Sequence, residues 1–395
     1  MRGVVLFVSL GIASSVSPAQ SPALTFDDIV QRSLADPALL ARTASLARWQ
    51  RELAATGRFT REGPTLETEL GPRRLGDGAL KTEAMARIEV PLLSGGRLRA
   101  DADSRLRGAG PEVLAAEKIA SRLRLRTAYL DVWLEQERLK VIDAQVHAIE
   151  QLLASVRKRV EGGAEAPYES ALVDGEMQRS RSESDRARSA LGEAWSELCA
   201  LVDLPVEPQA LASPGMPELS MPADAESKFQ SGLLRRAAAH RGSLESAFLG
   251  LEQALRRSRW SAAATLGKEA DDSVATVGAS YRFPRRGEGA ALTRERVTAG
   301  AAIDRGAEVE AARLATRFGT VIERAKRFGP VTSPDAFDDA LGAVALRVEL
   351  GKERPSLALP IRRQLLEARA AALQRIRDAH LLNAEIDALT AGDAP

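Results

Sequence analysis

The sequence has few of the residues that build catalytic centres or cross-linked cores. Phe, Trp and Tyr together make up 4% of its 395 residues, and it holds one Cys and three His. One Cys excludes an internal disulfide, and His147, His240 and His380 lie far apart, without the spacing of a metal site. No Gly-rich phosphate loop and no G-x-S-x-G elbow occurs. We therefore expect no enzyme, no metal ion and no cofactor.

Neither charge nor hydropathy is concentrated. The chain carries 55 Lys and Arg against 54 Asp and Glu, which gives no basic surface for nucleic acid. Beyond the N-terminus, no run approaches the ~20 apolar residues of a transmembrane helix. What the sequence does have is a composition rich in Ala, Arg, Leu and Glu, which favours a mainly α protein with extended helix packing.

The N-terminus has the pattern of an export signal. Arg2 precedes the apolar run Val4 to Ile12, and the small residues up to Ala19 offer a cleavage site before Gln20. The alternative is a membrane anchor, but the run is too short to span a bilayer. We expect residues 1–19 to be a signal peptide.

Two short segments change to the period-two alternation of a strand. In "MARIEVPLLSGG", Ile88 and Val90 alternate with charged residues, and Tyr281 and Phe283 occupy the matching positions of "GASYRFPRRGEG". Each segment follows a second alternating run, which predicts β-hairpins at about 64–92 and 261–284. The alternation suits lipid on one face and water on the other, and it equally suits a small soluble sheet that caps a helical body.

A heptad pattern follows the first hairpin. Apolar residues recur every seven positions over about 50 residues, with intermediate positions filled at spacings of three and four, which predicts a long coiled-coil helix. The seam consists of Leu125, Val132, Leu139, Val146, Leu153 and Val160, with Ile142, Ile149 and Val156 between them. A second stripe, which includes Leu130, Leu134 and Leu152, predicts contacts on another side of the same helix. The helix after the next turn has an unusually polar face, which either is simply exposed to bulk solvent or lines a water-filled space on one side.

The chain repeats itself once. "MARIEVPLLSGG" matches "GASYRFPRRGEG", and "GAEAPYESAL" matches "GKERPSLALP", at a similar separation of about 190 residues, which indicates a two-fold duplication. We expect a first repeat at 20–204, a linker at 205–223 and a second repeat at 224–395. Each repeat would hold helices, a β-hairpin and a long helical hairpin, the latter at about 98–204 and 290–391.

These elements, in this order, resemble the outer membrane efflux protein (TolC) family. The resemblance rests on "LTFDDIVQRSLADPALL", on "VPLLSGGRLRADADSRL" and on the two hairpin-tip segments "RVEGGAEAPYESALVDGEMQRSRSE" and "LRVELGKERPSLALPIRRQLLEARAA". It implies a homotrimer with a 12-stranded outer-membrane β-barrel and a periplasmic α-helical tunnel. It also implies outer-membrane lipid around Ile88, Val90, Tyr281 and Phe283.

The resemblance further implies that the hairpin tips meet a periplasmic adaptor (membrane fusion) protein. The tip residues that match the family pattern, or stand in its turn, are Arg159, Gly163, Pro167, Glu169, Arg347, Gly351 and Pro355. Two positions depart from the pattern: Ser170 replaces an aliphatic residue, and Leu357 replaces an acidic one.

The expected function is that of an exit duct in a tripartite efflux or type I secretion system, fed by an inner-membrane pump. The resistance-nodulation-division type is one candidate for the pump, and metal ions, drugs and polypeptides remain open as substrates. The alternatives are a periplasmic adaptor, which should carry one helical hairpin between lipoyl-like strands, and a structural coiled-coil protein, which should lack paired strand hairpins.

Overall fold

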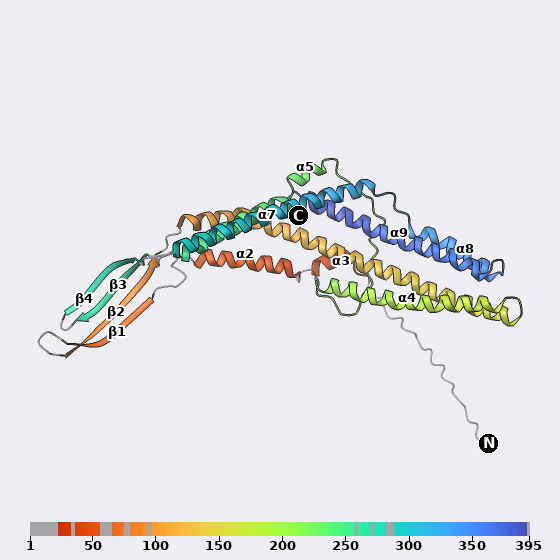
Figure 1. Cartoon of the computed structure of the whole chain (residues 1–395), viewed down its shortest axis with the longest axis horizontal. Coiled ribbons are helices and arrows are strands. Elements are labelled where there is room, and N and C mark those ends of the chain that lie inside the picture. The colour runs from red at the N-terminus through yellow and green to blue at the C-terminus, as the bar shows by residue number, and fades with distance from the viewer. Residues whose placement is uncertain are drawn as a thin grey trace, which may run out of the picture.

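The chain is long and narrow, with a β-sheet at one end and helical hairpin tips at the other (Figure 1). A computed structural model describes residues 23–32, 36–55, 65–74, 80–92, 96–256, 260–269, 272–281 and 288–392. The predicted signal peptide at 1–19 and the predicted lipid-facing Phe283 lie outside these residues. Within the described ranges, none of the helices has a stretch apolar and long enough for a bilayer crossing.

The elements of the described residues occur in the predicted order, twice. The first half consists of α1 (Phe26–Arg32), α2 (Pro37–Ala55), β1 (Thr65–Arg74), β2 (Leu80–Leu92), α3 (Gly96–Glu161) and α4 (Pro167–Cys199). The second half consists of α5 (Ala225–Gln230), α6 (Leu233–Arg256), β3 (Trp260–Glu269), β4 (Asp272–Tyr281), α7 (Glu288–Arg327), the 3-10 turn η1 (Pro334–Phe337), α8 (Asp338–Glu349) and α9 (Pro355–Thr390).

The chain enters the helical body through a capping box. The backbone N–H of Thr25 donates to Asp28 Oδ2 at 2.9 Å, and the N–H of Asp28 donates to Thr25 Oγ1 at 3.2 Å, so both ends of the box are satisfied. Helix α2 then begins as a separate helix at Pro37, where Asp36 caps it by accepting from the Ala38 N–H at 2.9 Å.

Helix α3 runs along the whole helical body of the molecule (Figure 1). Its 66 residues give a length of roughly 100 Å, from the sheet to the tip (Figure 1). It begins before the heptad pattern does, and it continues through Pro111, which is exposed and lacks an N–H. The nearby Ala109 and Val113 are buried in the cluster that α3 forms with α2 and α6. Both predicted stripes are used, because Leu125, Ile149 and Val156 of the seam and Leu130 of the second stripe are buried.

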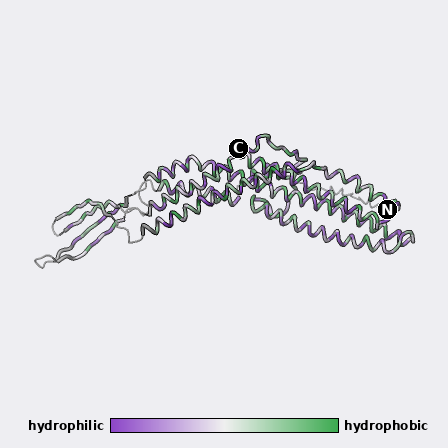
Figure 2. The backbone as a smooth tube through the Cα atoms, turned by 45° about the horizontal axis from the view of Figure 1, so that its top comes forward, coloured by the Kyte–Doolittle hydropathy of each residue, from purple (hydrophilic) through white to green (hydrophobic). Residues whose placement is uncertain are grey.

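The second half differs from the first in its ascending helix. Where the first half has the single helix α3, the second half has α7 and α8, separated by a segment that contains Gly329, Pro330 and Pro334. Successive prolines remove backbone donors and disfavour the helical conformation of the residues before them, so the helix stops. Hydrophobic and hydrophilic residues are mixed along all of these helices (Figure 2).

The linker crosses the middle of the molecule and is fixed to both halves. Leu24 and Leu211 form a β-bridge, and the Tyr129 hydroxyl on α3 donates to the Ala212 carbonyl at 2.5 Å. On the other side, Asn383 of α9 accepts from the Ser220 N–H at 3.2 Å. The linker therefore acts as a strap that joins α3 to α9 at the waist.

Candidate functional site: the hairpin tips and the exposed sheet

The two helical hairpins end in the same turn. Gly163 and Gly351 have φ values of 73° and 67°, a region that glycine enters at little steric cost. In the first turn, the N–H of Ala164 donates to Arg159 O at 2.8 Å, and in the second, the N–H of Lys352 donates to Arg347 O at 2.9 Å. This repetition supports the duplication that the sequence indicates.

Each turn is followed by a proline that starts the descending helix. Pro167 and Pro355 occupy the first turn of α4 and α9, where a missing N–H costs nothing. The residues before them, Ala166 and Arg354, share φ of -78° and ψ of 143°, so the two helices leave their turns in the same direction.

The two tips are bonded to each other within the chain. Arg159 Nη1 donates to the Val348 carbonyl at 2.8 Å. Glu169 is 1% exposed, and its carboxylate accepts from the Ser356 N–H at 2.9 Å and from the Ser356 hydroxyl at 2.8 Å. These contacts place Arg159 and Glu169 between the hairpins, and they hold α4 against the start of α9.

The matching residues of the second tip are exposed. The Arg347 side chain is 65% exposed and pairs only with Glu353 of its own turn, at 3.3 Å, among the described contacts. Gly163, Pro167 and Gly351 are also exposed, whereas Pro355 is buried. Of the seven tip residues expected from the sequence, the structure thus leaves four open to a partner and three within the chain.

The sheet at the other end has the strand order β1-β2-β3-β4, with antiparallel neighbours. Residues paired across antiparallel strands lie on the same face, so the register assigns each side chain to a face. One row pairs Leu66, Ile88, Ala264 and Val277. Ile88 is 47% exposed and Val277 is 88% exposed, so this apolar row is not covered by the rest of the chain.

The same register extends the apolar face toward the helices. Val90, half-buried, pairs with Ala262, which pairs with Ala279, and the next row ends at Tyr281. The structure therefore places Ile88 and Val90 on one face, as the alternation predicts, while the side chain of Tyr281 lies outside the described ones. We call the face of Ile88 and Val90 the apolar face.

The opposite face is polar. Arg87, Glu89, Thr265 and Thr276 lie on it, with Met85 and Val274 as apolar exceptions. Arg87 pairs with Glu89 at 3.4 Å, and the Ser261 hydroxyl donates to the Glu89 carboxylate. On one face of the sheet, polar groups thus bond one another, and on the other face, apolar side chains are exposed. A sheet that caps a hydrophobic core would instead bury its apolar face.

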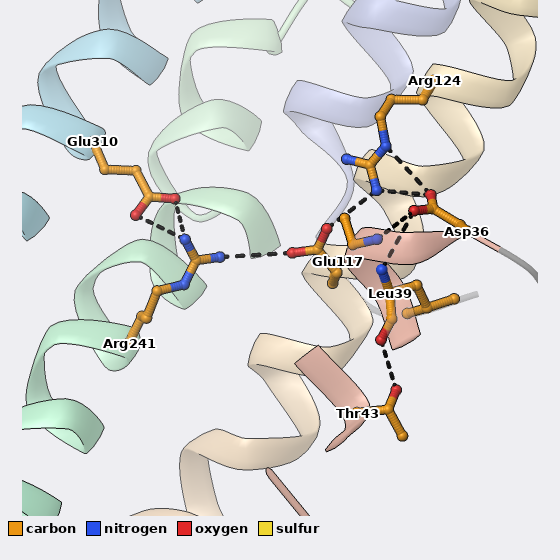
Figure 3. A network of polar contacts seen from close by, with 8 residues as sticks. Asp36, Leu39, Thr43, Glu117, Arg124, Arg241 and Glu310 are labelled. Atoms are coloured by element: carbon orange, nitrogen blue, oxygen red, sulfur yellow. Dashed lines mark hydrogen bonds and ion pairs between the residues drawn. The ribbon is translucent and has the colours of Figure 1, made fainter. Parts of the chain in front are cut away.

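A network of charges connects four helices between these two ends (Figure 3). Arg124 on α3 pairs with the buried Asp36 at 2.8 Å and with Glu117 at 3.2 Å. Arg241 on α6 lies 3.9 Å from Glu117 and 2.8 Å from Glu310 on α7. The alternating charges join α2, α3, α6 and α7, so the network fixes the first half against the second.

Burial and hydrogen bonding act in opposite directions on Asp36. Burial alone raises the pKa of this carboxyl, but hydrogen bonds from Ser121, from Arg124 and from the Ala38 N–H outweigh it, and the pKa is lowered. At the waist, burial raises the pKa of Tyr129 to about 12, so its hydroxyl stays protonated and keeps its bond to the strap.

Some residues that shape the tips were not singled out in the sequence. Ser356 donates two hydrogen bonds to Glu169, and the Val348 carbonyl accepts one from Arg159. The residue types of Ser356 and Val348 give no sign of these contacts. The signal that could have found them is the duplication itself, because each of these two contacts joins a residue to the neighbour of its counterpart in the other repeat. Among the described residues, no cluster of His, Cys, Asp or Glu is placed to hold a metal ion.

Neither a protein-family model nor a curated sequence matches the chain. Among solved structures, it is similar to the outer membrane protein VceC of Vibrio cholerae, with a TM-score of 0.67 at 13% identity over 93% of this chain and 96% of that one. The chain thus shares its fold with this outer membrane protein. The chain has the TolC-family fold.

Two further structures agree. The CmeC outer membrane channel of Campylobacter jejuni matches with a TM-score of 0.67 at 11% identity over 99% of this chain and 94% of that one. The open state of the Neisseria gonorrhoeae MtrE outer membrane channel matches with a TM-score of 0.64 at 15% identity over 93% and 89%. The TolC-family fold confirms the fold class expected from the sequence, with the exposed sheet and the tips at opposite ends.

Proposed function

We propose that this chain is a subunit of an outer-membrane channel, the exit duct of a tripartite efflux or type I secretion system. The observation that carries the proposal is the bare apolar face of the sheet, where Leu66, Ile88 and Val277 share one row. In water, such a face would be an aggregation site, whereas in a bilayer it is the surface that lipid contacts.

The sheet requires further copies of the chain. Its four strands cannot close alone, and β1 and β4 each pair on one side only in the described sheet. Three copies would pool twelve strands into one closed barrel, with the Arg87 and Glu89 face around water. The helical body would then extend through the periplasm as a tunnel, and the channel would conduct passively.

The hairpin tips are the proposed docking surface for a periplasmic adaptor, which connects the duct to an inner-membrane pump. The exposed turns around Gly163 and Gly351, together with Arg347 and Lys352, form the end of the molecule farthest from the sheet (Figure 1). Arg159, Glu169 and Pro355 support these turns from inside, because their contacts lie within the chain.

The alternative functions fit less well. A periplasmic adaptor has one helical hairpin, whereas this chain has two with the same turn. A structural coiled-coil protein has no use for a sheet with one bare apolar face. Both alternatives would predict a chain that is released without detergent.

The test is location and size. Membrane fractionation should recover the mature chain with outer membranes, and light scattering of the detergent-extracted protein should give the mass of a trimer. As a control, high-salt and carbonate washes should not release it. A monomer in the periplasmic fraction would refute the proposal.

Docking needs a separate test. The double substitution Arg347→Glu and Lys352→Glu reverses two exposed charges, and we expect it to reduce adaptor cross-linking and substrate export while trimer yield stays unchanged. Arg327→Glu, an exposed reversal at the end of α7, is the matched control. Equal adaptor capture by all three proteins would show that the tips are only turns.

A further inference from the structure

The duplicated tips have the same backbone but opposite exposure. Glu169 of α4 corresponds to Leu357 of α9, because Gly163 and Pro167 correspond to Gly351 and Pro355. Glu169 is 1% exposed and Leu357 is 62% exposed. One turn further along, Val173 is 0% exposed, whereas its counterpart Ile361 is 43% exposed. The helix face that is buried on α4 is therefore exposed on α9.

The reverse holds for the surface that receives this face. Pro355 and Ser356 lie against α4, with Pro355 buried and Ser356 bonded to Glu169. Their counterparts Pro167 and Tyr168 are exposed, with Tyr168 at 54%. Each hairpin thus has two contact surfaces. The giving surface is the helix face with Glu169 and Val173 on α4, or with Leu357 and Ile361 on α9. The receiving surface is the helix start with Pro355 and Ser356 on α9, or with Pro167 and Tyr168 on α4. The chain uses one giving surface and one receiving surface, and it leaves one of each free.

A ring of copies would use the surfaces that remain. We propose that Leu357 of one copy packs on Tyr168 of the next, in the place that Glu169 and Ser356 occupy within the chain; this proposal rests on the proposed trimeric channel. A giving surface on one side and a receiving surface on the other make a head-to-tail interface, which closes into a ring. The sheet follows the same rule, since β2 pairs with β3 between the halves and leaves β4 and β1 as its edges.

The chemistry of the two contacts differs. Within the chain, a carboxylate accepts two hydrogen bonds from a serine. Between copies, an aliphatic side chain would meet an aromatic ring, with Ile361 beside it on the same helix face. At the hairpin-tip end of the ring, polar contacts within each subunit would therefore alternate with apolar contacts between subunits. Apolar burial explains why Leu357 stands at a position that is acidic in the first tip.

Cysteine pairs test the assignment directly. In a Cys199→Ser background, Tyr168→Cys with Leu357→Cys should cross-link between copies under mild oxidation and give dimers and trimers on a denaturing gel. The matched control, Glu169→Cys with Ser356→Cys, should cross-link within the chain and leave a monomer band. Monomers from the first pair, with trimers still present by light scattering, would overturn the tip contact and leave the proposed channel intact. A monomeric native protein would overturn the channel itself.

Charge exchange gives a second test that does not depend on disulfide geometry. Leu357→Glu should lower the temperature at which the native trimer dissociates, because it places a carboxylate against Tyr168. Adding Tyr168→Ser should restore that temperature, because the pair then repeats the contact between Glu169 and Ser356. A double variant no more stable than Leu357→Glu alone would contradict the proposal.

Accessibility separates a second copy from an adaptor as the occupant. In purified trimers without any adaptor, the single variants Tyr168→Cys and Leu357→Cys should react slowly with a thiol reagent, and Lys352→Cys at the exposed turn should react rapidly. If the first two react as fast as the third and become protected only when the adaptor is added, the surfaces belong to the adaptor and the proposal fails.

Discussion

The two halves of the molecule share one plan but solve its local problems differently. The first half crosses the whole body with one helix, α3, and keeps Pro111 inside it, whereas the second half stops at Arg327 and resumes as α8. The tips are alike in every backbone bond of the turn and unlike in what covers them. Duplication thus preserved the turns, where geometry is demanding, and let the contacting surfaces diverge.

The sheet is where the halves should behave most alike. Ile88→Arg in the first half and Val277→Arg in the second place a charge in the same apolar row, and each should cost about 2 to 4 kcal/mol of folding free energy near the bilayer midplane. Urea titration of refolding into lipid vesicles measures it. Thr276→Arg, on the polar face, is the control and should fold normally. Equal damage on both faces would mean that the sheet is buried in protein.

The start of the second helix is where the halves should differ. Asp36 caps α2 and bonds to Arg124, whereas α6 begins after Gly232, where a Cβ would lie 2.9 Å from the Leu389 carbonyl oxygen. Asp36→Asn should lower the free energy of unfolding by about 2 kcal/mol at neutral pH, because it weakens a charge-assisted bond at a buried site. Denaturant titration of the detergent-solubilised protein measures it.

The same residue gives a pH dependence with a defined sign. The pKa of Asp36 is lower in the folded chain than in the unfolded one, so its contribution is present above pH 4 and declines as the pH falls below about 4. The native protein should therefore lose more stability than Asp36→Asn between pH 5 and pH 3. Parallel pH curves would show that Asp36 gains nothing from its ionised state.

The tip glycines test how far the turns are equivalent. Gly163→Ala and Gly351→Ala should each lower stability by about 1 to 2 kcal/mol, because both positions have left-handed φ values. No neighbouring atom within 4 Å would obstruct a Cβ at Gly163, so the cost there is conformational. Thermal unfolding followed by circular dichroism should give nearly equal shifts. A large difference would show that the two turns are not under the same strain.

The smallest effect separates the two tip arginines. Arg159→Gln should cost about 1 kcal/mol, because it removes the hydrogen bond to the Val348 carbonyl. Arg347→Gln, at an exposed side chain, should leave the melting temperature unchanged. The same unfolding measurement serves for both. Equal shifts would mean that the contact between the hairpins contributes nothing to stability.

Most of the architecture could be predicted from the sequence because it depends on periodicity. Alternation located the strands and assigned Ile88 and Val90 to one face, and the heptads located α3. The break after Arg327 could have been anticipated from Pro330 and Pro334, but Pro111 is a proline inside a helix, so proline alone does not decide. Near Pro111, the buried Ala109 and Val113 pack α3 in one cluster with α2 and α6.

The tip contacts could not be predicted in the same way. Arg159 and Arg347 occupy equivalent positions in sequence and in backbone, yet one is bonded to the other hairpin and one is exposed. Whether a residue or its counterpart in the other repeat is buried depends on which surface of its hairpin packs against the other hairpin of the same chain. That is a property of the assembled fold, and a single sequence pattern does not contain it.

The strap formed by the linker holds α3 at the middle of the molecule and so defines a pivot point for that helix. Gln136 binds the strap from α3, donating to the Gln209 carbonyl at 2.6 Å and accepting from the Leu211 N–H at 3.0 Å. The part of α3 beyond Gln136 is a lever arm of roughly 40 Å, so a rotation of about one degree at the strap moves the tip by roughly 0.7 Å. Small angular changes at the linker are therefore amplified into displacements, at the tip, of the order of a hydrogen bond's tolerance.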